Sequence, residues 1–168
     1  MLNEIGKQIE QSFAGVSAET GGEYRLKVEA DKESVLSILG FLKNHSYDHL
    51  ALISCVDRIE AGQLELVYLL NSYMESDDRY GEREKGTIIL KTTVSREDPE
   101  IGTAIHVFQN AEPYERELHE MFGIDFDGHP RQIPLFLEKD YAIPPFRKDF
   151  DTRDYVEKEL ESIPAVED

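Results

Sequence analysis

The stretch EPYERELHEMFGIDFDGHP, residues 112–130, separates a periodic part of the chain from an irregular part. Its apolar residues recur at the spacing of one helix face, namely Tyr114, Leu118, Met121 and Phe122. Gly123 follows at the position where many helices end in a left-handed residue. We therefore predict a helix over residues 112–122 that stops at Gly123.

Downstream of Gly123, prolines take the place of regular periodicity. Four of them forbid a long helix and favour extended or turning chain: Pro130, Pro134, Pro144 and Pro145. The same segment carries many large apolar side chains, which would expose hydrophobic area to water if the segment hung free. We expect this arm to pack on its own domain or on a partner. An acidic tail follows from Asp149, with a weak helix over residues 154–160.

Upstream of residue 112, the apolar pattern switches between the helix and strand periods. Helices are predicted over residues 2–13 and 31–44, the second with Asp31 as its N-cap. Strands are predicted over residues 24–29, 47–56, 64–73 and 87–94, with a turn at 59–63, a polar loop at 74–85 and one or two helical turns at 101–108. The second of these strands is apolar at nearly every position, which is typical of a central strand.

This order of elements predicts an α+β fold: a mainly antiparallel sheet with helices packed on one face, followed by an irregular, proline-rich C-terminal arm. The crossover helix is expected to bring the first strand beside the hairpin formed by the next two. We divide the chain into an α+β domain, residues 1–122, and an extended arm with an acidic tail, residues 123–168.

The net charge of −17 disfavours nucleic acid as a partner, because repulsion from phosphates would have to be overcome without a basic stripe. The longest uncharged apolar run, residues 50–56, is too short to span a bilayer. The N-terminus lacks the basic and apolar blocks of a signal peptide, so we expect a soluble intracellular protein. High charge and a single cysteine also suit a thermophile.

Cys55 is the only cysteine, and an iron–sulfur cluster usually takes four thiolates. Its apolar surroundings predict a buried free thiol. No phosphate-binding glycine loop and no nucleophile elbow are present. His106 lies between Ile105 and Val107, which favours a histidine at the edge of the core. We therefore expect no catalytic and no cofactor-binding residue.

The helix over residues 112–122 also carries a pattern of charges. Glu115 and His119 are spaced i, i+4, and His129 follows after Asp125 and Asp127, so a carboxylate–imidazole metal site can be drawn. No spacing matches a closed zinc or di-iron pattern, and we expect no metal. Arg116 is also spaced to bridge two acids on one face, Glu112 and Glu120.

Two separated motifs resemble the C-subunit family of respiratory complex I, the NADH:quinone oxidoreductase, which is also the NADH dehydrogenase 30 kDa family. The matching residues are Glu115, Arg116, Glu117, Met121, Phe122, Gly123, Ile124, Phe126, Gly128, His129 and Pro130, then Pro145, Phe146, Arg147, Lys148, Asp149 and Phe150. Departures at His119, Glu120, Phe146 and Asp151 favour a divergent member. The resemblance and the composition together favour an archaeal, membrane-bound energy-converting hydrogenase or a related complex.

The resemblance implies a non-catalytic subunit of the peripheral arm, on the cytoplasmic side of the cell membrane. Its expected partners are a hydrogenase-like large subunit, other peripheral-arm subunits and, indirectly, the membrane arm. Iron–sulfur clusters and a nickel–iron site are expected in those partners and not in this chain. The expected interface residues are Glu115, Arg116, Glu117, Phe122, Gly123, His129, Pro130, Phe146, Arg147, Lys148 and Asp149. The alternative is a free-standing acidic metalloprotein or enzyme that uses Glu115, His119 and His129.

Overall fold

A computed structural model of the chain describes residues 2–22, 24–72, 86–137 and 143–160. Its elements, in chain order, are helix α1 (Leu2–Ser12), strands β1 (Ser17–Thr20) and β2 (Arg25–Glu29), the short helix η1 (Lys32–Ser34), α2 (Val35–Asn44), β3 (His49–Arg58), η2 (Ile59–Ala61), β4 (Gln63–Asn71), β5 (Thr87–Ser95), β6 (Glu100–Gly102), α3 (Ala111–Phe122), β7 (Asp125–Asp127) and α4 (Thr152–Leu160). The predicted polar loop at 74–85 lies outside the described residues.

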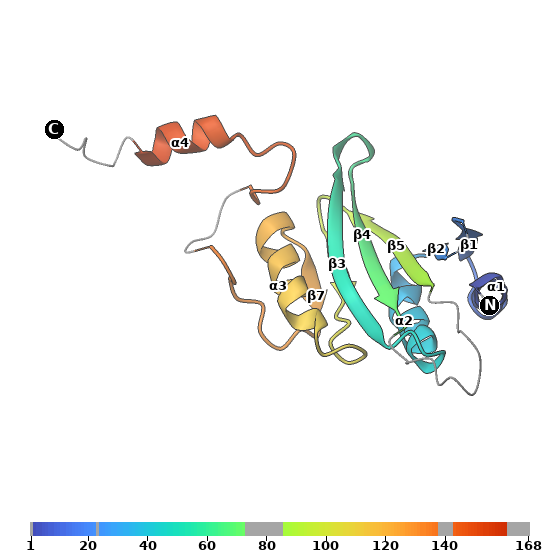
Figure 1. The fold of residues 1–168 in the computed structure, drawn as a ribbon. Coiled ribbons are helices and arrows are strands. Elements are labelled where there is room, and N and C mark those ends of the chain that lie inside the picture. Colours follow the sequence, from blue (N-terminus) through green and yellow to red (C-terminus); the bar gives the residue numbers. More distant parts are fainter. Residues whose placement is uncertain (1, 23, 73–85, 138–142, 161–168) are drawn as a thin grey trace.

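A five-stranded sheet forms the centre of the fold, in the order β1-β2-β5-β4-β3 (Figure 1). Strand β2 runs parallel to β5, and the other three pairings are antiparallel. The α+β class and the mainly antiparallel sheet are therefore confirmed. Strand β1 was not predicted, because its four residues, SAET, carry no apolar alternation and it is identified only by its pairing with β2.

Two predictions about strand order are wrong. Strand β3 lies at one edge of the sheet and is not central, because β4 pairs with β5 on its other side. Its apolar residues do not mean burial on both faces: Leu50 and Ile53 enter the core, whereas Ala51 and Leu52 are half-exposed. Strand β2 pairs with β5 and not with the β3–β4 hairpin, since the antiparallel return of β5 leaves one of its edges open for β2.

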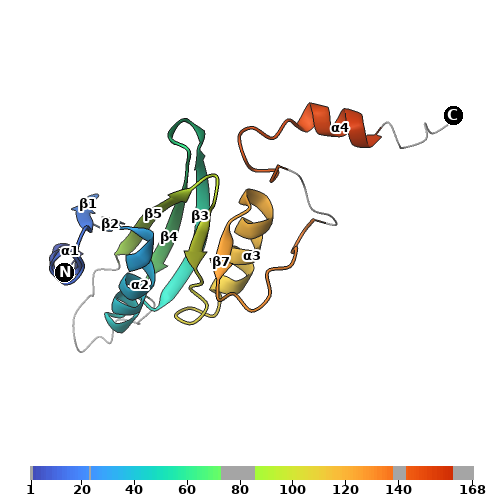
Figure 2. The same ribbon diagram turned by 180° about the vertical axis from the view of Figure 1, so that it is seen from behind.

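One face of the sheet carries the core. Its side chains include Leu26, Leu66 and Leu90, all essentially buried, and the helices pack against them. Helix α1 lies close enough that a Cβ on Gly6 would stand 3.2 Å from a methyl of Leu26. Figure 2 shows α2 against the sheet and α3 beside β3. The opposite face holds half-exposed side chains such as Val67 and Ile89. Helices on one face are thus confirmed.

A second, two-stranded sheet joins β6 to β7 in parallel, with Ile101 opposite Phe126. The prediction of helical turns over residues 101–108 is wrong at Ile101, which lies in strand β6. Three residues show too little periodicity to distinguish a strand from a helix, and the pairing partner of Ile101 lies 25 residues further along the chain. The first residues after Gly123 therefore pair with the region before α3. The division of the chain at residues 122 and 123 remains a prediction.

Within the described residues, no helix combines the length and the hydropathy that crossing a membrane requires. Cys55 is buried and free, as predicted. Burial, with a smaller effect of the neighbouring Asp57, raises the pKa of the thiol to about 12, so that it stays protonated at neutral pH.

Candidate functional site

Helix α3 is attached to the edge strand β3 by two side chains. Asn110, which precedes the helix, donates from Nδ2 to the carbonyl oxygen of Leu50 at 2.8 Å. The Tyr114 hydroxyl donates to the carbonyl oxygen of Ala51, also at 2.8 Å. The pairing of β3 with β4 shifts register between Leu50 and Leu52, so these bonds satisfy carbonyls at an irregular point of the strand. The exposed edge of the sheet is in this way covered by α3.

Glu115 lies on the buried side of α3, fully shielded from solvent. Its carboxyl accepts a hydrogen bond from the Thr103 hydroxyl at 2.5 Å and one from the backbone N–H of Ala104 at 2.6 Å. Burial raises the pKa of Glu115 to about 7, and these two hydrogen bonds only partly oppose the shift. Glu115 therefore ties the loop before α3 to the helix. Although Glu115 and His119 are spaced i, i+4, they do not form an exposed pair, because Glu115 is fully buried.

The side chains of Glu115, His119 and His129, the residues of the alternative metal site, each bond to a different part of the chain. The Nδ1 of His119 lies 2.8 Å from the carbonyl oxygen of Ile124, and the Nδ1 of His129 accepts from the N–H of Arg131 at 3.0 Å. Glu115 faces the loop at Thr103. Across residues 2–22, 24–72, 86–137 and 143–160, no three His, Cys, Asp or Glu side chains come together to hold a metal ion.

The charged side chains on the outer side of α3 bind the backbone of the arm. Arg116 donates from Nε to the carbonyl of Ile133 at 3.0 Å and from a terminal nitrogen to that of Pro134 at 2.9 Å. One turn later, the Glu120 carboxylate accepts from the N–H groups of Leu135 and Phe136, both at 3.1 Å, and from that of Leu137. The guanidinium of Arg116 thus donates to carbonyl oxygens of the arm, and the carboxylate of Glu120 accepts from its N–H groups. These bonds satisfy backbone groups of a segment that has no regular structure.

Arg116 forms an ion pair with Glu112 at 3.3 Å, as its i, i+4 spacing predicts. The prediction that Arg116 also bridges to Glu120 is wrong. In the part of the chain that the structure describes, the Glu120 carboxylate instead accepts from backbone N–H groups of the arm. Spacing along a helix shows which side chains can meet, but competition from a segment distant in sequence decides whether they do.

The end of the arm returns to the C-terminus of α3. The guanidinium of Arg147 donates from Nε to the carbonyl of Phe122 at 2.7 Å, and the N–H of Phe146 donates to that of Met121 at 3.0 Å. Both carbonyls belong to the last turn of the helix, where no backbone partner exists within the helix and a cation is favoured. Gly123 stands at this junction with φ +73°.

A second anchor connects the arm to the sheet. The nearly buried carboxylate of Asp57, at the end of β3, receives two bonds from Arg96 at 2.9 and 3.1 Å and one from the backbone N–H of Lys148 at 2.8 Å. Arg96 also pairs with Asp149 at 2.5 Å. Burial acts to raise the pKa of Asp57, but the bonds from Arg96 and Lys148 outweigh it and lower the pKa. The sequence pattern does not indicate a role for Asp57 or Arg96, since their partners lie 91 and 53 residues away.

The backbone of the arm is bonded to α3, and several of its large apolar side chains are exposed to solvent. Phe136 is 64% exposed and Phe146 is 56% exposed, and Ile133 and Ile143 are exposed as well. We call these four the exposed arm residues. The ring of Phe146 packs edge to face with that of Phe122, with the two ring centroids 5.8 Å apart. A hydrophobic surface of this kind on ordered backbone is typical of an interaction site.

The other expected interface residues are placed in three ways. Glu115 and Phe122 are buried within the chain, so their side chains serve its own packing. Arg116, Arg147 and Asp149 bond to the chain itself, and Lys148 does so through its backbone. Glu117, His129 and Pro130 are partly or fully exposed near the start of the arm. Whether any of them touches a partner stays a prediction.

The geometry describes an α+β domain that holds an extended arm with exposed phenylalanines, and comparisons with known proteins identify the class. The model of the family "Respiratory-chain NADH dehydrogenase, 30 Kd subunit" matches residues 28–156. The chain belongs to this family, as its motifs suggested, and the family is that of a subunit of complex I-related respiratory complexes.

Among its relatives is the C-subunit of the F(420)H(2) dehydrogenase of Methanosarcina mazei, 34% identical over 83% of this chain and 85% of the relative. The C/D-subunit of the NADH-quinone oxidoreductase of Yersinia enterocolitica is 31% identical over 73% of this chain, which spans only 21% of that longer protein.

Two solved structures share the fold. One is the structure of the membrane-bound sulfane sulfur reductase, an archaeal respiratory membrane complex, with a TM-score of 0.80, 25% identity and coverage of 99% of this chain and 95% of that chain. The other is a trypsin-resistant fragment of Nqo5, with a TM-score of 0.64, 24% identity and coverage of 77% of this chain and 98% of that chain.

Proposed function

We propose that this chain is a non-catalytic structural subunit of a membrane-bound redox complex, in which it braces a hydrogenase-like large subunit through its arm. The observation that carries the proposal is that α3 binds the backbone of the arm while large apolar side chains of the arm stay exposed. Arg116 and Glu120 bind the arm backbone, while Phe136 and Phe146 remain exposed. An arm that is already held in one conformation loses less conformational entropy when a partner binds it.

The parent complex we favour is of the membrane-bound hydrogenase type, with the chain at its periphery on the cytoplasmic side. The similarity to the membrane-bound sulfane sulfur reductase supports a membrane complex of this general kind, because the match extends over 99% of this chain. We further propose that the chain carries no redox cofactor and that the iron–sulfur clusters and nickel–iron site belong to partner subunits. Stoichiometric iron or flavin in the purified chain would contradict this.

The exposed phenylalanines provide the direct test. Phe136→Ser and Phe146→Ser are introduced singly and together into the tagged chain, and the complex is purified from the host. We expect the double variant to lose most of the co-purifying large subunit, since each large apolar side chain buried at an interface contributes about 1.5–3 kcal/mol. Tyr24→Ser is the matched control, because Tyr24 is a 48% exposed aromatic residue outside the arm.

Turnover per assembled particle separates bracing from catalysis. Residual complex that carries the Phe136, Phe146, Arg116→Ala or Arg147→Ala changes should work at close to the normal rate, because the redox centres are proposed to lie elsewhere. Normal assembly with abolished turnover would refute the bracing role and favour a catalytic one.

Limited proteolysis tests the position of the arm. We expect trypsin to cut within residues 124–150 faster in the isolated chain than in the complex, where a partner would cover the arm. Equal protection in both preparations would speak against arm docking.

A further inference from the structure

Phe146 stands on a short stretch of the arm whose backbone is bonded at three successive residues. Its own N–H donates to the carbonyl of Met121 at 3.0 Å, and the N–H of Arg147 donates to the carbonyl three residues earlier, also at 3.0 Å. The N–H of Lys148 donates to the Asp57 carboxylate at 2.8 Å. Because these three N–H groups are satisfied within the chain, the backbone that carries the Phe146 ring is in place before any partner binds.

Asp57 and Arg96 fasten this stretch to the five-stranded sheet. Asp57 is the second-last residue of β3, and its carboxylate receives two bonds from Arg96 at 2.9 and 3.1 Å. Arg96 directly follows β5, and its N–H donates to the carbonyl of Gly62, before β4, at 3.0 Å. Both side chains therefore project from backbone that is bonded within the sheet, on which the core packs.

Neither of these two side chains is accessible enough to serve as a contact for a partner. The side chain of Asp57 is 2% exposed and that of Arg96 is 15% exposed. Asp149, which bonds to Arg96 at 2.5 Å, is the exposed member of the group. Phe146, by contrast, has a largely exposed ring. An effect of Asp57 on binding must then pass through the arm.

We infer that Asp57 and Arg96 are positioning residues for Phe146, because they hold the arm in the conformation in which this ring enters an apolar pocket of the partner subunit. This role rests on the bracing function proposed above, and it assigns control of the arm's affinity to residues outside the interface. A ring that is presented on fixed backbone binds more tightly, since less conformational entropy is lost. If only a fraction of the molecules presents the ring, the apparent affinity falls by that fraction.

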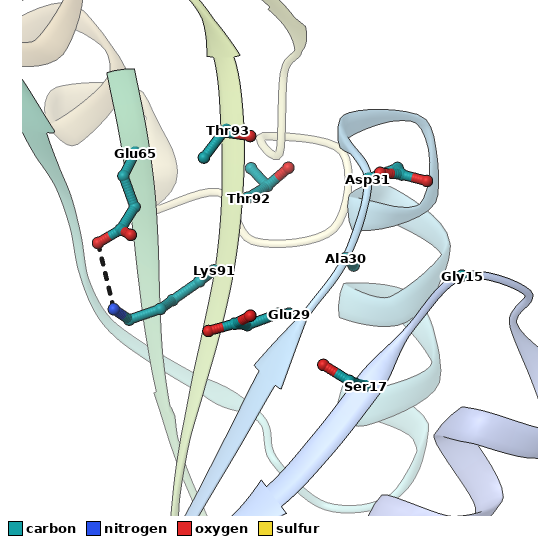
Figure 3. A pocket seen from close by; sticks show the side chains of 9 residues that line it. All are labelled: Gly15, Ser17, Glu29, Ala30, Asp31, Glu65, Lys91, Thr92 and Thr93. Carbon is teal, nitrogen blue, oxygen red and sulfur yellow. Dashed lines mark hydrogen bonds and ion pairs between the residues drawn. The ribbon is translucent and has the colours of Figure 1, made fainter. Parts of the chain in front are cut away.

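The ion pair between Glu65 and Lys91 supplies a matched control. It joins β4 to β5 at 3.1 Å on the open face of the sheet (Figure 3), and Glu65 also accepts from Arg58 at 3.1 Å. Glu65 is thus a partly buried carboxylate with cationic partners, as Asp57 is, but in the described chain none of its bonds reaches the arm. Glu65→Gln therefore removes the same charge and comparable ion pairs while the arm stays anchored.

Competition within the host measures the effect on assembly. A tagged variant and the untagged, unmodified chain are co-expressed, and the complex is purified through another subunit. Mass spectrometry then gives the ratio of the two chains in the complex relative to the unassembled pool. We expect Asp57→Asn to lower this ratio about ten-fold, and Asp149→Asn, which removes only the exposed contact, about three-fold. Glu65→Gln and the tagged, unmodified chain should both compete equally with the untagged chain.

A double variant separates positioning from general damage. Because Asp57 acts through Phe146, adding Asp57→Asn to Phe146→Ser should lower the ratio little further than Phe146→Ser alone. Fluorine NMR of the isolated chain, labelled with fluorophenylalanine, gives a structural readout. In Asp57→Asn the signal of Phe146 should narrow and move toward that of the free amino acid, whereas the signal of the buried Phe126 should stay in place.

The outcomes distinguish the positioning role from the bracing function. Absence of the unmodified chain from the complex would refute the bracing function itself. Normal competition by Asp57→Asn beside poor competition by Phe146→Ser would overturn the positioning role alone, as would additive losses in the double variant or an unchanged Phe146 signal. If the Phe126 signal also moves in Asp57→Asn, the domain has unfolded, and Asp149→Asn then decides by the same readouts.

Discussion

At the scale of single residues, Glu115 couples the fold to pH. Its folded-state pKa of about 7 lies above the ordinary value of a glutamate, so the folded chain binds an extra proton between roughly pH 4.5 and 7. Stability contributed by this group is therefore present at the acidic end of that window and is lost as the pH rises through the folded pKa.

We predict that the contribution of Glu115 to the free energy of unfolding falls by about 3 kcal/mol between pH 5 and pH 8. Urea unfolding of the isolated chain at both pH values measures it. Glu115→Gln should flatten the slope, because an amide can still accept from Ala104 and bond to Thr103 without titrating. An identical slope in the variant would show that other groups are responsible.

Gly123 occupies a backbone conformation that favours glycine. Its φ of +73° costs an alanine about 1–2 kcal/mol, and the added Cβ would stand 3.0 Å from Pro144 of the arm. Gly123→Ala should lower the free energy of unfolding by at least that amount. Gly40→Ala, in helix α2 with no atom within 4 Å of the new Cβ, should instead stabilise the chain by about 0.5–1 kcal/mol. Equal effects in thermal melts would contradict the role given to Gly123.

At the scale of elements, α3 works as a support for the arm. It is bonded to β3 through Asn110 and Tyr114 and to the loop before it through Glu115. Its charged residues Arg116 and Glu120 face chain that lacks regular structure. Because each acid or base satisfies two or three backbone groups at once, the loss of one side chain should release several bonds together.

Glu120→Gln tests this coupling in the isolated chain. The neutral amide offers a weaker acceptor to the N–H groups of Leu135, Phe136 and Leu137, so chymotrypsin should cleave after Phe136 several-fold faster. Glu117→Gln is the matched control on the same helix, since no hydrogen bond or ion pair of its side chain appears among the described residues. Mass spectrometry of the first fragments gives the cleavage site. Equal rates in the two variants would show that Glu120 does not hold the arm.

At the scale of the whole molecule, the net charge of −17 sets a self-repulsion that opposes the compact state. Raising the salt concentration from about 10 to about 150 mM shortens the screening length from roughly 30 to 8 Å. We predict a higher midpoint of thermal unfolding at the higher salt, by about 2–4 °C for each kcal/mol of repulsion removed. Near pH 4.6, the isoelectric point, the same salt step should produce no rise in circular-dichroism melts. A salt-independent midpoint at pH 7 would mean that the acidic groups are already compensated.

The sequence alone determined the class of fold, the main helices and strands, the stop at Gly123 and the family. These follow from local physics: side-chain period, the conformational freedom of glycine and the restrictions of proline act within a few residues. The two motifs were readable for the same reason, because they are contiguous.

Tertiary structure alone decided the strand order, the pairing of β6 with β7 and the partners of the charged residues. Arg116 and Glu120 are spaced i, i+4, yet the Glu120 carboxylate accepts hydrogen bonds from the backbone of the arm. Asp57 likewise accepts from the N–H of Lys148, which lies 91 residues further along the chain. Such choices depend on which groups compete for the same acceptor once the chain has closed on itself.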